Sequence, residues 1–227
     1  MPETLLFAGP SAFGIAPSVF RDAQVRLRPP ARRGDIERLL DDEPAEPGVL
    51  IVADGIFQVA AAVSHAELCA AMDAGWQVWG VSSLGAIRAH ELRHEGMHGF
   101  GEVFAMFSRL EDFTDDEMCL LHFPEPPYFP VTEALVNVRH ALARHGPDLG
   151  IPRAAALALV DALAQCWFGE RTPALIRSLM VDRLGVAPAA ADALLRRLES
   201  DRVKTTDLEQ MMASAPWRVR QVRARTP

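Results

Sequence analysis

Residues 78–92 read VWGVSSLGAIRAHEL, a pattern that predicts a buried strand passing directly into a helix. The apolar residues Val78 to Val81 form the strand, and two adjacent serines, Ser82 and Ser83, occupy the turn before the helix. Such a turn brings hydroxyl groups, backbone N–H groups and the positive end of a helix together, which suits the binding of an anion or an oxyanion. We therefore expect a site here as well as a core element.

Three more apolar runs precede this one and predict the other strands of a sheet. Leu5 to Ala8 and Val49 to Ala53 are continuous, whereas Val25 to Leu27 contains Arg26 and predicts a weaker strand. Strands buried on both faces read as continuous apolar runs, so these runs favour a parallel sheet. Helix signals lie between them, including Ser64 and Glu67 at the spacing of a capping box. Strand–helix units in direct succession indicate right-handed crossovers and a doubly wound sheet.

The chain changes character after Gly101, where no further strand is expected. Helices are predicted near residues 132–145, 152–168, 173–184, 188–200 and 206–213. The predicted fold class is therefore α/β: a Rossmann-like parallel sheet of about four strands with flanking helices, followed by an all-helical C-terminal part. The expected domain organisation is an α/β core over 1–122, a proline-rich connector over 123–130 and a helical region over 131–227.

Composition argues against several classes of protein. The 227 residues are 49% hydrophobic and 23% charged, which allows a packed core, and the formal net charge of −7 disfavours nucleic-acid binding. The three cysteines lie far apart and form no C-x-x-C pair, so neither a disulfide framework nor a zinc ribbon is indicated. With no signal-peptide pattern and no long apolar stretch, a cytoplasmic location without membrane contact is expected.

Polar residues follow every predicted strand, and in a parallel sheet these strand ends lie at one edge. Ser11 follows the first strand, Arg33 and Asp35 follow the second, Asp54 follows the third, and the two serines follow the fourth. Taken singly, each residue is better interpreted as a turn former or a helix cap. Taken together, they predict a ligand site outside the carboxyl ends of the strands.

The serine turn comes close to a catalytic motif without matching it. Nucleophile elbows read G-x-S-x-G, whereas Gly80 and Gly85 place the second glycine one position late. A serine nucleophile also needs a base, for which His65 and His90 are the candidates in the sequence. The pattern fits better with a helix N-terminus that holds a carboxylate, a thiocarboxylate or a phosphate.

Other motifs in the same region favour structural interpretations. Arg88 and Glu91 lie three residues apart on the predicted helix, so they share a face and can pair, or the guanidinium can bind an anion. His94 and His98 complete a literal H-E-x-x-H, but Gly96 lies inside it near an expected helix end, so zinc binding is not expected. The acidic run 115–117 is explained as the charged first turn of a helix, with a Mg²⁺ or partner contact as its alternative.

A series of short blocks occurs in a specific order along the chain. The blocks are Gly9-Pro10-Ser11, Pro29-Pro30-Ala31-Arg32-Arg33-Gly34-Asp35-Ile36, Asp54-Gly55-Ile56-Phe57-Gln58, Ser64-His65-Ala66-Glu67-Leu68, residues 80–92, Gly96-Met97 with Gly99 and Gly101, and Asp115-Asp116-Glu117. This ordered set resembles the TfuA-like proteins and covers roughly the first half of the chain. The chain departs from that pattern at Val81 and His90, where small residues are usual, and at Leu84, where methionine is usual.

The resemblance implies a role in thioamide formation as the partner of a YcaO enzyme. YcaO enzymes use ATP to activate a backbone amide of a peptide or protein, and with a TfuA partner sulfur replaces the amide oxygen. The implied partners are the YcaO enzyme, a sulfur-carrier protein and, indirectly, the precursor peptide or protein; no cofactor or metal is expected, and homo-oligomer formation is left open. The family's shared polar residues fall on Arg33, Asp35, Asp54, His65, Ser82, Ser83, Arg88 and Glu91.

Two hypotheses follow from the resemblance and the strand-end residues. In the first, the protein is a hydrolase that releases sulfide from a thiocarboxylated carrier. Ser82 or Ser83 then acts as nucleophile or oxyanion binder, His65 or Asp54 as base, and Arg33 or Arg88 as the clamp on the carrier's C-terminal carboxylate, with Asp35, Glu91 and Ser11 completing the substrate-binding set.

In the second hypothesis the protein is a non-catalytic adaptor. The polar cluster then binds an anionic group or the partner, and the helical half docks on the YcaO enzyme. A nucleotide-binding domain is a third and less favoured interpretation, because the sequence contains no G-x-G-x-x-G or P-loop motif.

Overall fold

The computed structural model of this chain describes residues 3–42, 46–56, 60–111 and 113–218. It divides into two compact units, a sheet unit made of 1–111 with 207–227 and a helical unit made of 112–206. The boundary falls inside one helix, α10 (Val203–Ser214). The predicted domain limits at residues 122 and 130 stay a prediction. Phe57 and Gln58, quoted above for the resemblance, lie outside the described residues.

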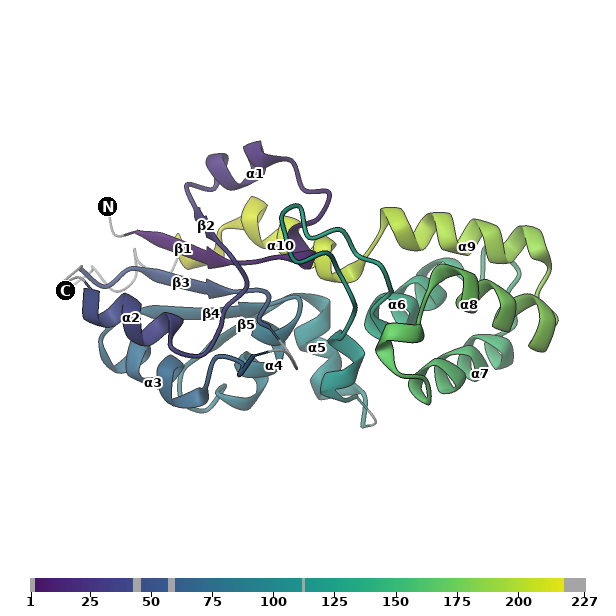
Figure 1. Cartoon of the computed structure of the whole chain (residues 1–227), viewed down its shortest axis with the longest axis horizontal. Helices are drawn as coiled ribbons and strands as arrows, with labels where there is room; N and C mark the ends of the chain where they lie inside the picture. The colour runs from purple at the N-terminus through teal and green to yellow at the C-terminus, as the bar shows by residue number, and fades with distance from the viewer. Residues whose placement is uncertain (1–2, 43–45, 57–59, 112, 219–227) are drawn as a thin grey trace. The chain divides into compact units, whose positions relative to one another are not determined.

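The sheet unit contains a five-stranded parallel sheet (Figure 1), which confirms the predicted fold class. Its strands are β1 (Thr4–Phe7), β2 (Arg26–Arg28), β3 (Val49–Val52), β4 (Gln77–Val81) and β5 (His98–Phe100), and their order is β2-β1-β3-β4-β5. The four predicted runs correspond to β1 to β4. The strand order reverses direction between β1 and β3, and this switch point is where open parallel sheets bind ligands.

The expectation of about four strands missed β5. This strand has three residues with Gly99 at its centre, so it contains no apolar run that periodicity could detect. The helix before it, α4 (Leu84–Glu91), ends earlier than the predicted pattern suggested, which leaves residues 92–97 free to turn into the strand. Tertiary pairing with β4, in which Gly99 lies opposite Gly80, therefore decides this element.

Helices cover both faces of the sheet (Figure 1). The residues of α10 from Asp207 onward and α1 (Pro17–Asp22) pack on one face, where Phe20, Met211 and Trp217 join a core with the strand residues Ile51 and Trp79. On the other face lie α2 (Asp35–Asp42), α3 (His65–Asp73) and α4, with α5 (Gly101–Arg109) beside α4. Because both faces are covered, the central strands are apolar on both sides, as predicted.

The capping box at the start of α3 is confirmed. The Ser64 hydroxyl accepts a hydrogen bond from the Glu67 amide at 3.3 Å, and the Glu67 carboxylate accepts one from the Ser64 amide at 2.9 Å. Two otherwise unpaired backbone donors are thereby satisfied. Gly75, just after the helix, has φ +90°, the left-handed conformation that favours glycine at this position.

The described elements of the helical unit are helices and short turns. They are α6 (Leu135–His145), α7 (Arg153–Ala164), α8 (Pro173–Ser178), a π-helical turn (Leu179–Arg183), α9 (Pro188–Ser200), the first residues of α10, and 3-10 turns at Asp115–Met118 and Phe168–Glu170. This confirms the helical C-terminal part. Among all the residues described, no helix is both long and apolar enough to cross a membrane.

The acidic run at 115–117 holds the helical unit together through buried arginines. Arg171 is fully buried; it pairs with the Asp116 carboxylate and donates to the Asp116 carbonyl at 3.0 Å and the Leu163 carbonyl at 3.0 Å. The buried Glu117 accepts hydrogen bonds from Arg139 at 2.8 and 3.0 Å. These contacts support the structural interpretation of the acidic run.

Candidate functional site

Strands β1, β3 and β4 end level with one another at the carboxyl edge of the sheet. Phe7 lies opposite Val52, and Val52 lies opposite Gly80. Counting two residues onward from each of these, Asp54 and Ser82 occupy equivalent positions beyond neighbouring strands. Adjacent strands are about 4.8 Å apart, so this register brings the aspartate and the first serine to the same edge of the sheet, with Asp54 at the switch point and Ser82 one strand beyond it.

The Asp54 carboxylate organises the loop after β1. One oxygen accepts hydrogen bonds from the backbone amides of Gly9 at 2.8 Å and Ser11 at 2.9 Å, and the other accepts the Ser11 hydroxyl at 2.7 Å. Asp54 is 2% exposed. The structure thus brings together two of the predicted residues, Asp54 and Ser11, and three donors already satisfy the carboxylate.

The serine turn has the backbone of a nucleophile elbow although its sequence differs from the motif. Ser82 has φ +66°, a conformation that non-glycine residues rarely adopt and that costs about 1–3 kcal/mol. A Cβ on Gly80 would collide with the Gly85 carbonyl, and a Cβ on Gly85 would collide with the Val52 carbonyl. Both glycines are therefore needed for α4 to begin directly against β3 and β4. Gly85, one position later than the second glycine of the elbow motif, allows the close packing of helix on strand that an elbow requires.

Both serines are buried, and the turn uses several of its own donors and acceptors. Ser82 is 0% exposed and Ser83 is 3% exposed. The Ser83 amide donates to the Val81 carbonyl at 2.8 Å, and the Gly85 amide donates to the Ala53 carbonyl at 3.2 Å. Ser83 is the N-cap of α4, but its side chain makes no capping hydrogen bond. These two amides are thus engaged within the protein.

His65, Arg88 and Glu91 form a charged cluster at the last turn of α4. The Glu91 carboxylate is 2.7 Å from His65 Nε2 and accepts a hydrogen bond from Arg88 at 2.6 Å, while Arg88 Nε donates to the Val63 carbonyl at 3.0 Å. The predicted Arg88–Glu91 pair is confirmed. Burial alone would raise the pKa of Glu91, but the hydrogen bonds from His65 and Arg88 outweigh it and lower the pKa below its ordinary value.

This cluster lies along α4 from the serines. Glu91 follows Ser83 by eight residues, which corresponds to about 12 Å along the helix axis. The imidazole of His65 is held by Glu91 and is half exposed, at 52% of its side-chain surface. Of the two candidate bases, the sheet register places Asp54 nearer to Ser82.

Arg33 and Asp35 follow β2, as predicted, but their hydrogen bonds are local. The Arg33 amide donates to the Ala61 carbonyl at 3.0 Å, and its side chain is exposed. The Asp35 carboxylate accepts the Arg32 amide at 2.7 Å and pairs with Arg38 one turn along α2.

Glu67 contributes more than sequence reasoning assigned to it. Besides completing the capping box, its carboxylate accepts the Gly34 amide at 2.6 Å, and it is 2% exposed. It therefore ties the loop after β2 to the start of α3. The S-x-x-E spacing was the visible signal, but the long-range partner is set by the fold.

The three histidines that follow α3 in the sheet unit, His90, His94 and His98, lie in a helix, a turn and a strand. His90, considered above as a base, stacks on Phe107 with ring centroids 5.1 Å apart, and burial, followed by the Arg93 charge, lowers its pKa. His94 lies in a turn and His98 in β5, so H-E-x-x-H does not form one helical face. Among the described residues, no group of three or more His, Cys, Asp or Glu side chains is arranged to hold a metal ion.

Comparison with known families gives one result. The family model described as TfuA-like protein matches residues 54–172, more than half of the 227 residues. The match begins at Asp54 and includes the serine turn, the charged cluster and part of the helical unit. It therefore extends further into the helical half than the resemblance recognised from the motifs. No curated protein matches the chain in sequence.

Proposed function

Since the chain belongs to the TfuA-like protein family, which links it to thioamide-forming YcaO systems, we propose that it supplies sulfur to a YcaO enzyme. The proposed activity is release or delivery of sulfide from a thiocarboxylated sulfur-carrier protein, for ATP-dependent backbone thioamidation of a peptide or protein. The observation that carries the proposal is Ser82 at φ +66° between two close-packed glycines, at the carboxyl edge of a parallel sheet and one strand from its switch point.

The net reaction is hydrolysis of the thiocarboxylate. The Ser82 hydroxyl attacks the thiocarboxylate carbon and transfers its proton to a base, and the carbon–sulfur bond then breaks to release sulfide and leave an ester on the serine. Water hydrolyses this ester, so that one thiocarboxylate and one water give one carboxylate and one hydrogen sulfide. The proton balance requires a base near Ser82.

Asp54 and the charged cluster have separate roles in this proposal. Asp54, which follows the strand next to that of Ser82, is the proposed base. Its carboxylate already accepts three hydrogen bonds from the Gly9–Ser11 loop, so accepting the serine proton requires one of these bonds to be given up. Arg88, whose side chain is 15% exposed, and the exposed Arg33 bind the anionic end of the carrier. His65 and Glu91 orient Arg88, and Asp35 orders the loop that carries Arg33.

A second candidate function is favoured by the burial of the serines. A side chain that is 0% exposed reaches a carrier only if the surrounding atoms move. A non-catalytic adaptor needs no such movement, because it binds and stimulates the YcaO enzyme through its surface. The two functions differ in whether the Ser82 hydroxyl is needed.

The test measures sulfide release from a thiocarboxylated carrier by the purified full chain. Ser82→Ala and Ser82→Gly both remove the hydroxyl, and the glycine variant also relieves the positive φ. We expect release to fall by about 10²-fold or more in both, while Ser18→Ala on α1 stays at the wild-type rate. Undiminished release in the Ser82 variants would reject the serine mechanism. No release by the wild type, with tight binding to a YcaO enzyme, would establish the adaptor.

A further inference from the structure

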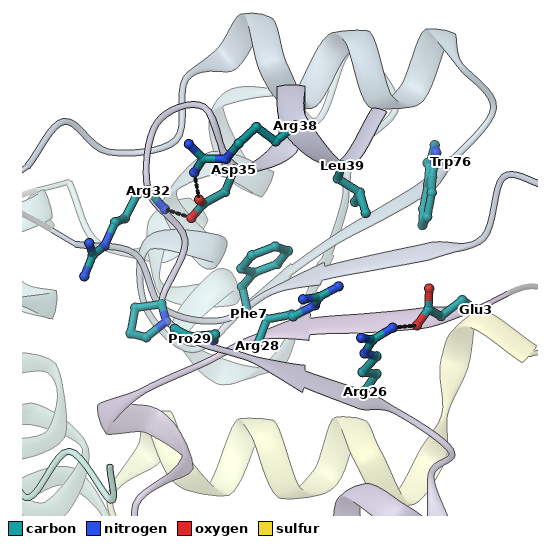
Figure 2. Close-up of a pocket in the computed structure, with 11 residues that line it drawn as sticks. Glu3, Phe7, Arg26, Arg28, Pro29, Arg32, Asp35, Arg38, Leu39 and Trp76 are labelled. Atoms are coloured by element: carbon teal, nitrogen blue, oxygen red, sulfur yellow. Dashed lines mark hydrogen bonds and ion pairs between the residues drawn. The ribbon is translucent and has the colours of Figure 1, made fainter. Parts of the chain in front are cut away.

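A cavity of about 640 Å³ lies along the edge strand β2, between the sheet and α2 (Figure 2). Its lining comes from β1 and the residue before it, from β2 and the loop after it, from α2, and from the residue before β4. The lining residues are Glu3, Phe7, Arg26, Arg28, Pro29, Pro30, Arg32, Asp35, Arg38, Leu39 and Trp76. Its volume is in the range typical of small-molecule sites.

The cavity is basic in an otherwise acidic protein. Four arginines and two carboxylates line it, which leaves a formal charge of +2, whereas the whole chain carries −7. Like charges gathered around one cavity repel each other, and an anionic ligand relieves that repulsion. The charge distribution therefore favours an anion here.

Two of the arginines have protein partners and two do not. Arg26 pairs with Glu3 at 3.0 Å, and Arg38 pairs with Asp35. The side chains of Arg28 and Arg32 make no ion pair or hydrogen bond within the part of the chain that the structure describes. Figure 2 shows Arg28 extending between Phe7 and the Arg26–Glu3 pair, whereas the side chain of Arg32 extends away from Arg28.

The cavity also has an apolar wall. Phe7 and Trp76 are each 7% exposed, and Leu39 of α2 is partly exposed. An inorganic anion alone would leave this wall in contact with water, whereas a ligand with an apolar or aromatic body would cover it. Guanidinium groups fork onto phosphate oxygens, and several of them suit a ligand that carries more than one negative charge.

We propose that this cavity binds a polyphosphate of nucleotide size, with the phosphates on Arg28 and the base or sugar against Phe7 and Leu39, while Arg32 adds positive charge at the loop end of the cavity. The arginine side chains replace the glycine-rich backbone loop of common nucleotide sites, which the sequence lacks. The site lies along β2 and shares Asp35 with the carrier-binding residues proposed above. Neither Arg28 nor Arg32 has a role in the proposed sulfide release, so ATP binding and sulfide release can fail independently.

Isothermal titration of the full chain with ATP, ADP, pyrophosphate and adenosine tests the proposal. Arg28→Gln and Arg32→Gln remove the charges and leave a shorter polar side chain, and Arg21→Gln on α1 is the matched control. We expect the Kd for ATP to rise about tenfold or more in Arg28→Gln, the loss typical of one hydrogen bond to a charged group. A smaller rise is expected in the more exposed Arg32→Gln, and no change in Arg21→Gln.

The four probes separate the sources of affinity. ATP binding that exceeds pyrophosphate binding supports a nucleotide, and equal binding of both overturns the role of the apolar wall. The proposal is rejected if no phosphate compound binds, if adenosine binds as tightly as ATP, or if both cavity variants bind ATP as the wild type does. Circular dichroism of each variant shows that it is folded, so that lost binding is assigned to the cavity.

Discussion

The sheet unit and the helical unit each contain a buried ionic side chain that ties separate segments together. Asp54 accepts three hydrogen bonds from the Gly9–Ser11 loop, and Arg171 donates to carbonyls from two segments and pairs with Asp116. Their locations differ: Asp54 lies at the switch point of a parallel sheet, whereas Arg171 lies among helices. Both side chains are held by several hydrogen bonds. Asp54 differs in lying at the switch point of the sheet, and this position makes it part of a candidate site.

The largest effect is expected from Arg171→Met in the helical unit. The substitution leaves the Leu163 and Asp116 carbonyls without their buried donor, so the free energy of unfolding should fall by about 3 kcal/mol or more. Urea unfolding followed by circular dichroism measures the loss, and Arg196→Met, at an exposed position on α9, is the control. A loss equal to that of the control would show that Arg171 does not organise this unit.

A smaller effect is expected from Asp54→Asn in the sheet unit. The amides of Gly9 and Ser11 both bond to one carboxylate oxygen and the Ser11 hydroxyl bonds to the other, so asparagine replaces a charged acceptor by a neutral one and sets an NH2 group against that hydroxyl. All three hydrogen bonds weaken, and we expect a loss of about 2 kcal/mol. Hydrogen exchange of these two amides should accelerate beyond the global change in stability. Asp22→Asn, at an exposed position on α1, should alter neither quantity. Unchanged exchange at Gly9 and Ser11 would contradict the role assigned to Asp54.

A third buried ionic group, Asp207, should make the free energy of unfolding depend on pH. Its carboxylate accepts the amides of Glu102 and Val103 at 2.9 Å each, at the start of α5. Burial nevertheless outweighs these bonds and raises the pKa of Asp207 to about 6, from 3.8 in the unfolded chain. The folded state then binds more protons at Asp207 than the unfolded state between these values. The contribution of Asp207 to stability is therefore fully present below pH 3.8 and is lost as pH rises through 6.

Asp207→Asn removes this titration. Relative to the variant, the wild type should lose on the order of 2 kcal/mol of unfolding free energy as pH rises from about 4 to about 6.5. If the unfolding free energies of the two proteins change in parallel with pH over this range, the pKa of Asp207 is not raised. If the wild type instead gains unfolding free energy relative to the variant as pH rises, the hydrogen bonds from the amides of Glu102 and Val103 lower the pKa of Asp207 more than burial raises it.

Local sequence patterns were sufficient for much of the sheet unit. Continuous apolar runs predicted β1 to β4, the S-x-x-E spacing predicted the Ser64–Glu67 cap, and the three-residue spacing predicted the Arg88–Glu91 pair. Each of these depends on residues close in the chain, so its signal is local. β5 could not be predicted in this way, because three residues around Gly99 form a strand only when β4 lies beside them.

Long-range partners were beyond local patterns. The bonds from Gly9 and Ser11 to Asp54 span more than 40 residues of chain, and the bond from Gly34 to Glu67 spans 33. The strand-end rule predicted that Ser11 and Asp54 would lie at one edge, but not that they would bond to each other. The rule likewise did not show that His65 is held at the far end of α4 from the serines.

The sequence by itself determined the α/β class, the run from strand to helix through Ser82 and Ser83, and the resemblance to TfuA-like proteins. Those features reside in hydrophobic periodicity, capping residues and ordered motifs, which need no knowledge of distant contacts. Only the tertiary structure decided the positive φ of Ser82, the burial of both serines and the gathering of arginines around the cavity along β2. These depend on strand order, on close approach of Gly80 to Gly85, and on residues from several elements meeting in space, which chain spacing does not specify.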